Sequence, residues 1–194
     1  MRRLLLVVLT VAVTVGLAGA PASAQTKVRK DKIGDAVANV DIRSAKVQNN
    51  SRNYAVTVRV QRVQRGVTGT VVLLLPAGAG NPDDATIYGV ATIPISGGRY
   101  STQLFDLGSE LDDEDRVSCP GLTSRVERGA RGYVRTTVPQ SCLGSAAGTL
   151  AALVGTFDKR DAGFRTAMRA ARRGDEPTSD TNDVVDSFIT TRRG

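Results

Sequence analysis

The sequence predicts an all-β fold, an antiparallel β-sandwich of the jelly-roll or immunoglobulin type, with one disulfide behind a cleaved signal peptide. Three observations predict it: apolar and polar residues alternate in short segments, turn signals separate these segments, and helical periodicity is scarce. About eight such strands, each with one apolar face to bury, indicate two packed sheets. A closed barrel is the main competing architecture.

Two segments show the clearest strand patterns. Residues 54–60 alternate, with Tyr54 and three valines on one side and Thr57 and Arg59 on the other, which is typical of a half-buried strand. Residues 70–75 form a continuous apolar run that ends at Pro76. We therefore expect this run to be a central strand buried on both faces.

Weaker patterns complete the predicted strand order. Residues 86–93 and 99–105 flank Ser96-Gly97-Gly98, whose turn chemistry predicts a hairpin. Residues 164–171 fit a short basic helix, and they fit an exposed strand nearly as well. Composition and alternation also predict loops at 78–84, 112–115 and 174–183, and strands at 39–47, 132–138, 150–157 and 184–190.

The start of the chain has the three parts of a secretory signal peptide. Met1-Arg2-Arg3 is positively charged, residues 4–17 are apolar, and Ala22-Ser23-Ala24 is a small-residue cleavage site. The apolar run is short for a membrane span, which needs about 20 residues, and no later segment is long and apolar enough. We expect a secreted protein of the cell envelope: a signal peptide at 1–24, a flexible N-terminal arm at 25–32, and one β-sandwich domain at 33–194.

Export also decides how the two cysteines are interpreted. Disulfides form and persist outside the cytoplasm, and Cys119 and Cys142 are the only cysteines of the chain. A bridge between them would stabilise the fold by about 3 kcal/mol in the chain-entropy model. A reactive thiol or a metal-ligand pair is the alternative, but the chain contains no histidine to partner it. We predict a structural disulfide.

Composition argues against several classes of function. The formal net charge is +7, but basic and acidic residues alternate along the chain, so no nucleic-acid-binding tract stands out. A mildly cationic surface of this kind suits an anionic cell envelope. The absence of histidine removes the Ser-His-Asp triad, the Cys-His pair and His-ligated zinc. Since glutamates are also scarce, we expect the protein not to be an enzyme.

Asp31, Asp35 and Asp41 are the candidate metal ligands. They are spaced D-x-x-G-D-x5-D-I ahead of a predicted strand. Calcium takes several oxygen ligands from carboxylates and backbone carbonyls, so this segment could hold a calcium ion. The alternative is that Asp31 and Asp35 form Asx turns around Gly34, since the spacing is not that of an EF-hand loop. The other acidic groups, residues 112–115 and Asp180, Asp183 and Asp186, are interpreted as solvated loops.

Aromatic side chains limit the prospects for sugar binding. The chain has no tryptophan, and the credible stacking platforms are Tyr54, Tyr88, Tyr100 and Tyr133. Tyr54 shares the apolar side of its strand, so we expect it in the core. Two exposed tyrosines on one sheet would favour a carbohydrate-binding role.

Two sets of short motifs resemble a known group of proteins. The first is Asp31-x-x-Gly34-Asp35, followed by Asp41-Ile42 and the strand at 54–60. The second is Val117-x-Cys119-x-Gly121-Leu122 with Val138-Pro139-x-Ser141-Cys142-Leu143-Gly144. Together they resemble small secreted proteins of uncharacterised function from high-GC actinobacteria, over most of the chain after the leader. The resemblance implies a jelly-roll-like sandwich akin to DOMON and family 9 carbohydrate-binding modules, with Cys119 bonded to Cys142. It leaves the function open, because the wider group binds haem, sugars or calcium.

The leading functional prediction is a secreted, non-enzymatic module with a structural or interaction role at the cell envelope. Its predicted partner is a cell-envelope polysaccharide or another secreted protein. A first alternative is a carbohydrate-binding module with a structural calcium ion. A second is a secreted protease inhibitor that presents the segment between Cys119 and Cys142.

Overall fold

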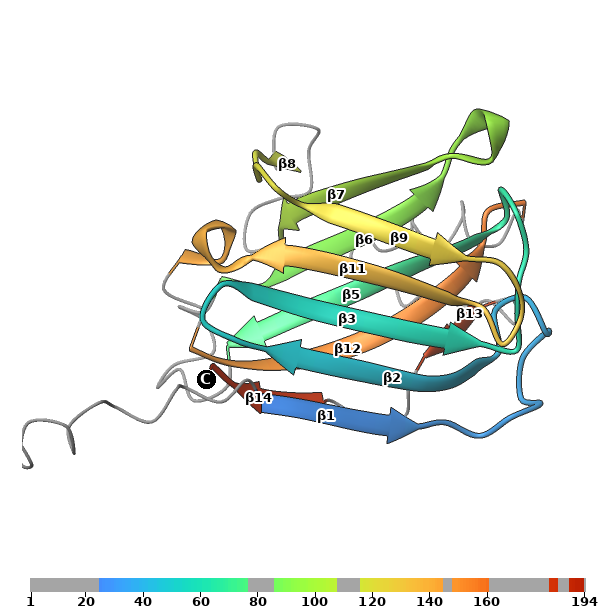
Figure 1. Cartoon of the computed structure of the whole chain (residues 1–194), viewed down its shortest axis with the longest axis horizontal. Helices are drawn as coiled ribbons and strands as arrows, with labels where there is room; N and C mark the ends of the chain where they lie inside the picture. The colour runs from blue at the N-terminus through green and yellow to red at the C-terminus, as the bar shows by residue number, and fades with distance from the viewer. Residues whose placement is uncertain are drawn as a thin grey trace, which may run out of the picture.

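The chain folds into two antiparallel sheets that face each other across an apolar interior, as the computed structural model shows (Figure 1). The structure describes residues 25–76, 86–107, 116–144, 148–160, 182–184 and 189–193. In these ranges no helix is long and apolar enough to cross a membrane. Several predictions fall outside the described residues: the signal peptide at 1–24, the loops at 78–84 and 112–115, the segment 164–171, most of 174–183, and Asp180 and Asp186.

The first sheet has the strand order β1-β2-β3-β11-β9. All four of its pairings are antiparallel, and β3 lies at its centre. Its strands are β1 (Gln25–Lys30), β2 (Ile42–Asn49), β3 (Asn53–Val60), β11 (Tyr133–Pro139) and β9 (Thr123–Glu127).

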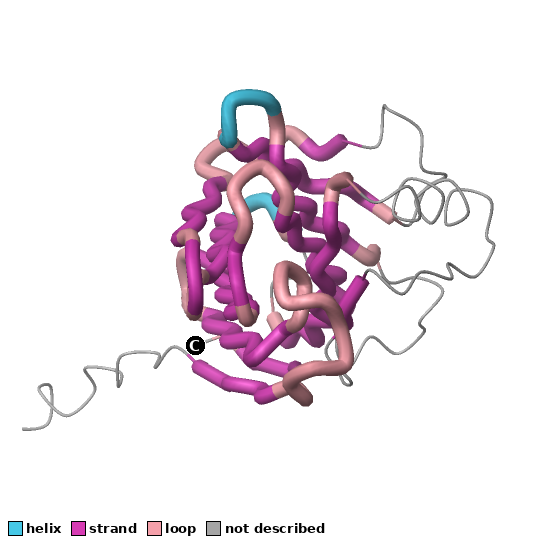
Figure 2. Tube along the Cα trace, turned by 90° about the vertical axis from the view of Figure 1, so that its right-hand side faces the viewer, coloured by secondary structure: helices cyan, strands magenta, loops and turns pink. Residues whose placement is uncertain are grey.

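The second sheet has the order β13-β12-β5-β6-β7-β8, and β14 pairs with β12 beside β13. Figure 2 shows the strands of the two sheets as two layers, so the β-sandwich prediction is confirmed. The strands of this sheet are β13 (Asn182–Val184), β12 (Thr149–Asp158), β5 (Thr68–Pro76), β6 (Tyr88–Pro94), β7 (Tyr100–Asp106), β8 (Arg116–Val117) and β14 (Ile189–Arg192). Two short strands, β4 (Arg62–Val63) and β10 (Gly129–Ala130), pair separately.

Strand β3 shows why the interior forms where it does. Tyr54, Val56, Val58 and Val60 are at most 3 % exposed, and they all point into the space between the sheets. Between them, Thr57 and Arg59 point outward. This confirms the prediction of a half-buried strand at 54–60, with Tyr54 in the core. Buried residues of β2, β5, β11 and β12 complete the same apolar cluster.

Strand β5 is central, as the apolar run at 70–75 predicts, because it pairs with β12 on one side and β6 on the other. Val72 and Leu74 are buried in the interior, but the intervening apolar residues are only half-buried on the opposite side, so the expectation of burial on both faces holds for the inner face alone. The predicted hairpin is also present: β6 and β7 pair around a 3-10 turn at Ser96–Gly98. Gly97 and Gly98 both have positive φ there, which explains the glycines of this turn.

The expectation of a loose arm at 25–32 is wrong for most of its length. Gln25–Lys30 forms β1, which pairs with β2 along six residues. Five of these six residues are exposed, so the strand is held by backbone hydrogen bonds and has no apolar period to detect. Two other predicted strands differ in extent: 39–47 begins only at Ile42, and 184–190 corresponds to the separate strands β13 and β14.

One part of the interior is polar. The Thr92 hydroxyl of β6 lies 2.9 Å from the Thr136 hydroxyl of β11, across the two sheets. Nearby, the Thr102 hydroxyl of β7 donates to Ser124 of β9 at 2.6 Å. These two pairs of hydroxyl groups connect the sheets at positions where threonine and serine take the place of apolar side chains.

Substituting Gly69 tests how tightly the far side of the second sheet is packed. A Cβ built on Gly69 would lie 2.2 Å from the ring of Phe157, which is directly opposite on β12 and only 2 % exposed. We expect Gly69→Ala to lower the free energy of unfolding by about 1–3 kcal/mol, because the enclosed ring must move. Gly148→Ala is the matched control, since a Cβ there meets nothing within 4 Å. Equal stability of the two variants in urea denaturation would contradict the packing described.

Removing the hydroxyls of Thr92 and Thr136 tests the polar bridge between the sheets. We expect Thr136→Val to lower the free energy of unfolding by about 1–2 kcal/mol, because the buried Thr92 hydroxyl then loses its hydrogen bond to Thr136. The double variant Thr92→Val/Thr136→Val should lose less than the two single variants together. A double-mutant cycle measured by urea denaturation gives the coupling, and strict additivity would mean that the two hydroxyls do not interact.

Candidate anion-binding face

The outward side of the first sheet is rich in cations. Five basic residues point away from the interior on β1, β2, β3, β11 and β9, which we call the cationic face: Lys30, Lys46, Arg59, Arg135 and Arg125. The alternation that buries the valines of β3 and β11 places these side chains outward. Among the outward residues of these five strands, Glu127 is the only carboxylate.

Strand register arranges these cations in rows across the sheet. One row runs from Lys46 through Thr57 to Arg135 and Arg125, each directly opposite the next. The neighbouring row contains Lys30, Arg59 and Tyr133, and it ends at Glu127. Neighbouring strands lie about 4.8 Å apart, so positive charge recurs at short intervals across the face.

The pair Arg125 and Arg135 is the most concentrated point of this charge. The two residues are directly opposite on β9 and β11, and both are exposed. Like charges in such a cross-strand pair repel and destabilise the pairing. In the part of the chain that the structure describes, no carboxylate forms an ion pair with either guanidinium.

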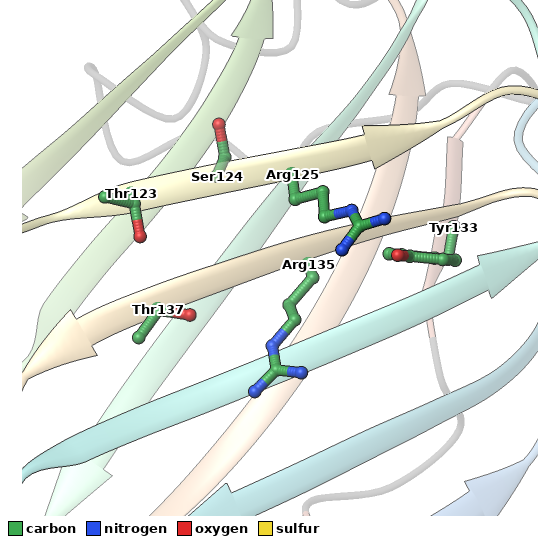
Figure 3. Close-up of a pocket in the computed structure, with 6 residues that line it drawn as sticks. All are labelled: Thr123, Ser124, Arg125, Tyr133, Arg135 and Thr137. Atoms are coloured by element: carbon green, nitrogen blue, oxygen red, sulfur yellow. The ribbon is translucent and has the colours of Figure 1, made fainter.

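A hollow of about 280 Å³ opens beside this arginine pair (Figure 3). It is lined by Thr123, Ser124, Arg125, Tyr133, Arg135 and Thr137. Figure 3 shows the Arg125 side chain extending toward Tyr133 and the Arg135 side chain extending over β3, while Ser124 points the other way. Its hydroxyl is engaged inside the sandwich by Thr102, so only its backbone belongs to this surface.

Tyr133 closes one end of the hollow and is held by a cation. The guanidinium of Arg59 lies 5.6 Å from the centroid of its ring, within the range of a cation–π contact. The ring is half-buried and belongs to the same row as Arg59. Tyr133 is therefore a positioned aromatic group on the cationic face.

The other tyrosines do not share this surface. Tyr54 is fully buried, and burial raises the pKa of its hydroxyl. Tyr88 packs against the core, and Tyr100 lies on the same side of β7 as the buried Leu104. The four tyrosines thus place one ring on the face, not the pair that a carbohydrate platform would favour.

The cysteines form the predicted disulfide, which is confirmed with an S–S distance of 2.05 Å. It links the segment before β9 to the 3-10 turn Gln140–Cys142 after β11, at the same end of both strands. The segment between Cys119 and Cys142 is therefore built from β9, β10 and β11. The protease-inhibitor prediction relied on this segment as a rigid presented loop, and most of it is instead strand.

The three aspartates predicted as calcium ligands occupy different environments. Asp41 is fully buried, and its Oδ2 accepts a hydrogen bond from the Gly34 backbone N at 2.8 Å. Asp35 is exposed, and Asp31 is half-buried. Among the described residues, no group of three or more acidic, cysteine or histidine side chains is placed to hold a metal ion. The buried Asp41 orders the turn at Gly34, and calcium binding stays a prediction.

A carboxylate that the sequence did not single out, Asp158, accepts several hydrogen bonds. Asp158 accepts hydrogen bonds from Asn39 at 2.7 Å and from the Arg160 guanidinium at 2.8 Å. Burial acts to raise the pKa of Asp158, but the hydrogen bonds from Arg160 and Asn39 outweigh it and hold the pKa below its ordinary value. This cluster joins the end of β12 to the segment before β2, so its role is structural.

Comparison with protein-family models, curated proteins and solved structures finds no match to this chain. The resemblance to DOMON and family 9 carbohydrate-binding modules stays a prediction from short motifs. The outward side of the first sheet is therefore the main basis for a functional proposal.

Acid titration tests the role of Asp158. Because its pKa is lowered on folding, its ionised form stabilises the fold above the pKa of the unfolded chain, about 4, and this contribution is lost as pH falls through the folded value. We expect the free energy of unfolding to fall as the pH drops below about 5, and to fall less steeply in Asp158→Asn. Arg160→Gln should also flatten the dependence. Identical acid profiles for wild type and Asp158→Asn would contradict this assignment.

Proposed function

We propose that this protein is an exported, non-enzymatic interaction module whose cationic face binds an anionic partner at the cell envelope. The charge distribution on the outward side of the first sheet is the main support for this proposal. Five cations and one carboxylate point outward from five adjacent strands, and the strand register arranges the cations in rows. A surface of one sign attracts partners of the opposite sign and raises their local concentration.

The form of this surface supports binding to something extended. The hollow beside Arg125 and Arg135 has room for one acidic group and part of the unit that carries it, and the remaining cations lie on strands to one side of the hollow. A partner that neutralises all five cations must span the width of the sheet. A polymer with repeated acidic groups meets this requirement with one contact per cation.

Two further features support a role outside the cytoplasm. The leader at 1–24 has the composition of a signal peptide, and the disulfide between Cys119 and Cys142 suits an oxidising compartment. Anionic polymers are abundant at cell surfaces, so a rigid sheet that displays cations suits that location.

Retention on immobilised dextran sulfate tests the proposal. The secreted chain should be retained at low salt and released as salt rises, because binding depends on release of counterions. We expect Lys46→Glu/Arg59→Glu to weaken binding at least about 30-fold, since each cation near an anionic surface contributes about 1 kcal/mol. Both residues lie on the cationic face.

The matched control is Arg62→Glu/Lys159→Glu, which changes net charge equally at exposed positions outside the strands of the first sheet. It should be retained almost as well as wild type. Equal loss in the two double variants would show that only net charge matters, and no retention of wild type would remove the proposed function.

A further inference from the structure

The arginine pair on β9 and β11 is set apart from the rest of the cationic face by its neighbours. Arg125 and Arg135 are directly opposite, so their Cβ atoms are about 4.5–5.5 Å apart. In the next row, Thr123 is directly opposite Thr137, and both line the hollow. On the other side of the pair, Tyr133 closes the hollow. The cluster thus combines two guanidinium groups, two hydroxyl-bearing side chains and one aromatic ring.

This set of groups is suited to an oxyanion. A guanidinium group presents its N–H donors in a planar fork that matches the two oxygens of a carboxylate or phosphate. Threonine hydroxyls can donate further hydrogen bonds. An oxyanion between the two arginines would also cancel the repulsion of the cross-strand pair, which no carboxylate of the described chain relieves.

We infer that the hollow between β9 and β11 is a subsite for the acidic group of an anionic polysaccharide. This inference rests on the proposed function and names its ligand class. Arg125 and Arg135 hold the oxyanion, Thr123 and Thr137 contact oxygens beside it, and the Tyr133 ring packs against the saccharide that carries it.

Several observations favour a polysaccharide over other polyanions. The hollow of about 280 Å³ admits a single acidic group with part of its sugar. The face offers one aromatic ring, whereas single-stranded nucleic acid is usually bound by several stacked rings. Thr57 lies between Lys46 and Arg135, and the row beside these cations contains Thr26, Gln48, Thr137 and Thr123. These polar side chains suit a chain rich in hydroxyl groups.

The acidic group itself can be a uronate carboxylate or a phosphodiester, since both present two oxygens to an arginine fork. Isothermal titration of the secreted chain with short oligomers distinguishes these sources. The probes are tetragalacturonate, a glycerol-phosphate tetramer and neutral maltotetraose. We expect one or both acidic oligomers to bind at least tenfold more tightly than the neutral one. Equal affinity for all three would overturn the subsite.

Variants separate the subsite from diffuse attraction. Arg125→Gln/Arg135→Gln should lose at least tenfold in affinity for the preferred oligomer. Arg125→Lys/Arg135→Lys keeps the charge but removes the forks, and it should lose nearly as much. The control Lys30→Gln/Lys46→Gln removes the same charge from the same face, and its loss of affinity should be at least threefold smaller than that of Arg125→Gln/Arg135→Gln. All four substituted positions are on the outward side of the sheet, so thermal unfolding should confirm that each variant folds.

The failure modes of the two proposals differ. The subsite is wrong if Lys30→Gln/Lys46→Gln weakens oligomer binding as much as Arg125→Gln/Arg135→Gln does, or if Arg125→Lys/Arg135→Lys binds like wild type. In either case the cationic face still binds polyanions. If wild type binds neither the acidic oligomers nor immobilised dextran sulfate, both proposals fail.

Discussion

The alternation of side chains along β3 and β11 is the constraint on which the rest of the structure depends. Each strand must bury its valines between the sheets, so each must point its polar residues outward. A slip of one residue would reverse both faces, which makes the register costly to change. The register that buries Val134, Val138 and their neighbours is therefore the one that places Arg135 opposite Arg125. Core packing and the candidate site follow from the same pattern.

The edge of the first sheet needs additional support, because among the described strands β9 pairs with β11 alone. Two features provide it. The disulfide joins the ends of the two strands, and the Ser124 hydroxyl accepts a hydrogen bond from Thr102 of the opposite sheet. Together they fix the strand that carries Arg125, so the arginine pair is held in place despite its mutual repulsion. A site on a sheet fixed in this way can bind with little rearrangement.

The strongest parts of the fold could be predicted from local pattern, and the weaker parts could not. Strand β3, the central strand β5 and the β6–β7 hairpin have alternation, apolar runs or turn glycines that act within a few residues. Strand β1 was missed because an edge strand exposed on most of its length needs no apolar period. Strand β9 was also missed, although Ser124 and Val126 alternate with outward residues. Its inward position 124 is a polar serine, whose hydrogen-bond partner is Thr102 of the opposite sheet, so the local sequence shows no apolar alternation.

The candidate site was not predictable for a related reason. Along the chain the basic residues look scattered among acidic ones, but the pairing of β2, β3, β11 and β9 gathers Lys46, Arg59, Arg135 and Arg125 on one face. That pairing joins segments distant in sequence, which local periodicity does not specify. The aspartates near the N-terminus behave in the opposite way. They are close in sequence and suggested a shared site, but the structure places them in environments of different burial.

Amide NMR spectra recorded during titration with an acidic oligosaccharide locate the bound face residue by residue, so they show whether the first sheet carries the binding surface. We expect the largest shift changes on β9, β11 and β3, around Arg125, Arg135 and Tyr133. Changes confined to the second sheet, or to the loops at the ends of the sandwich, would contradict this expectation.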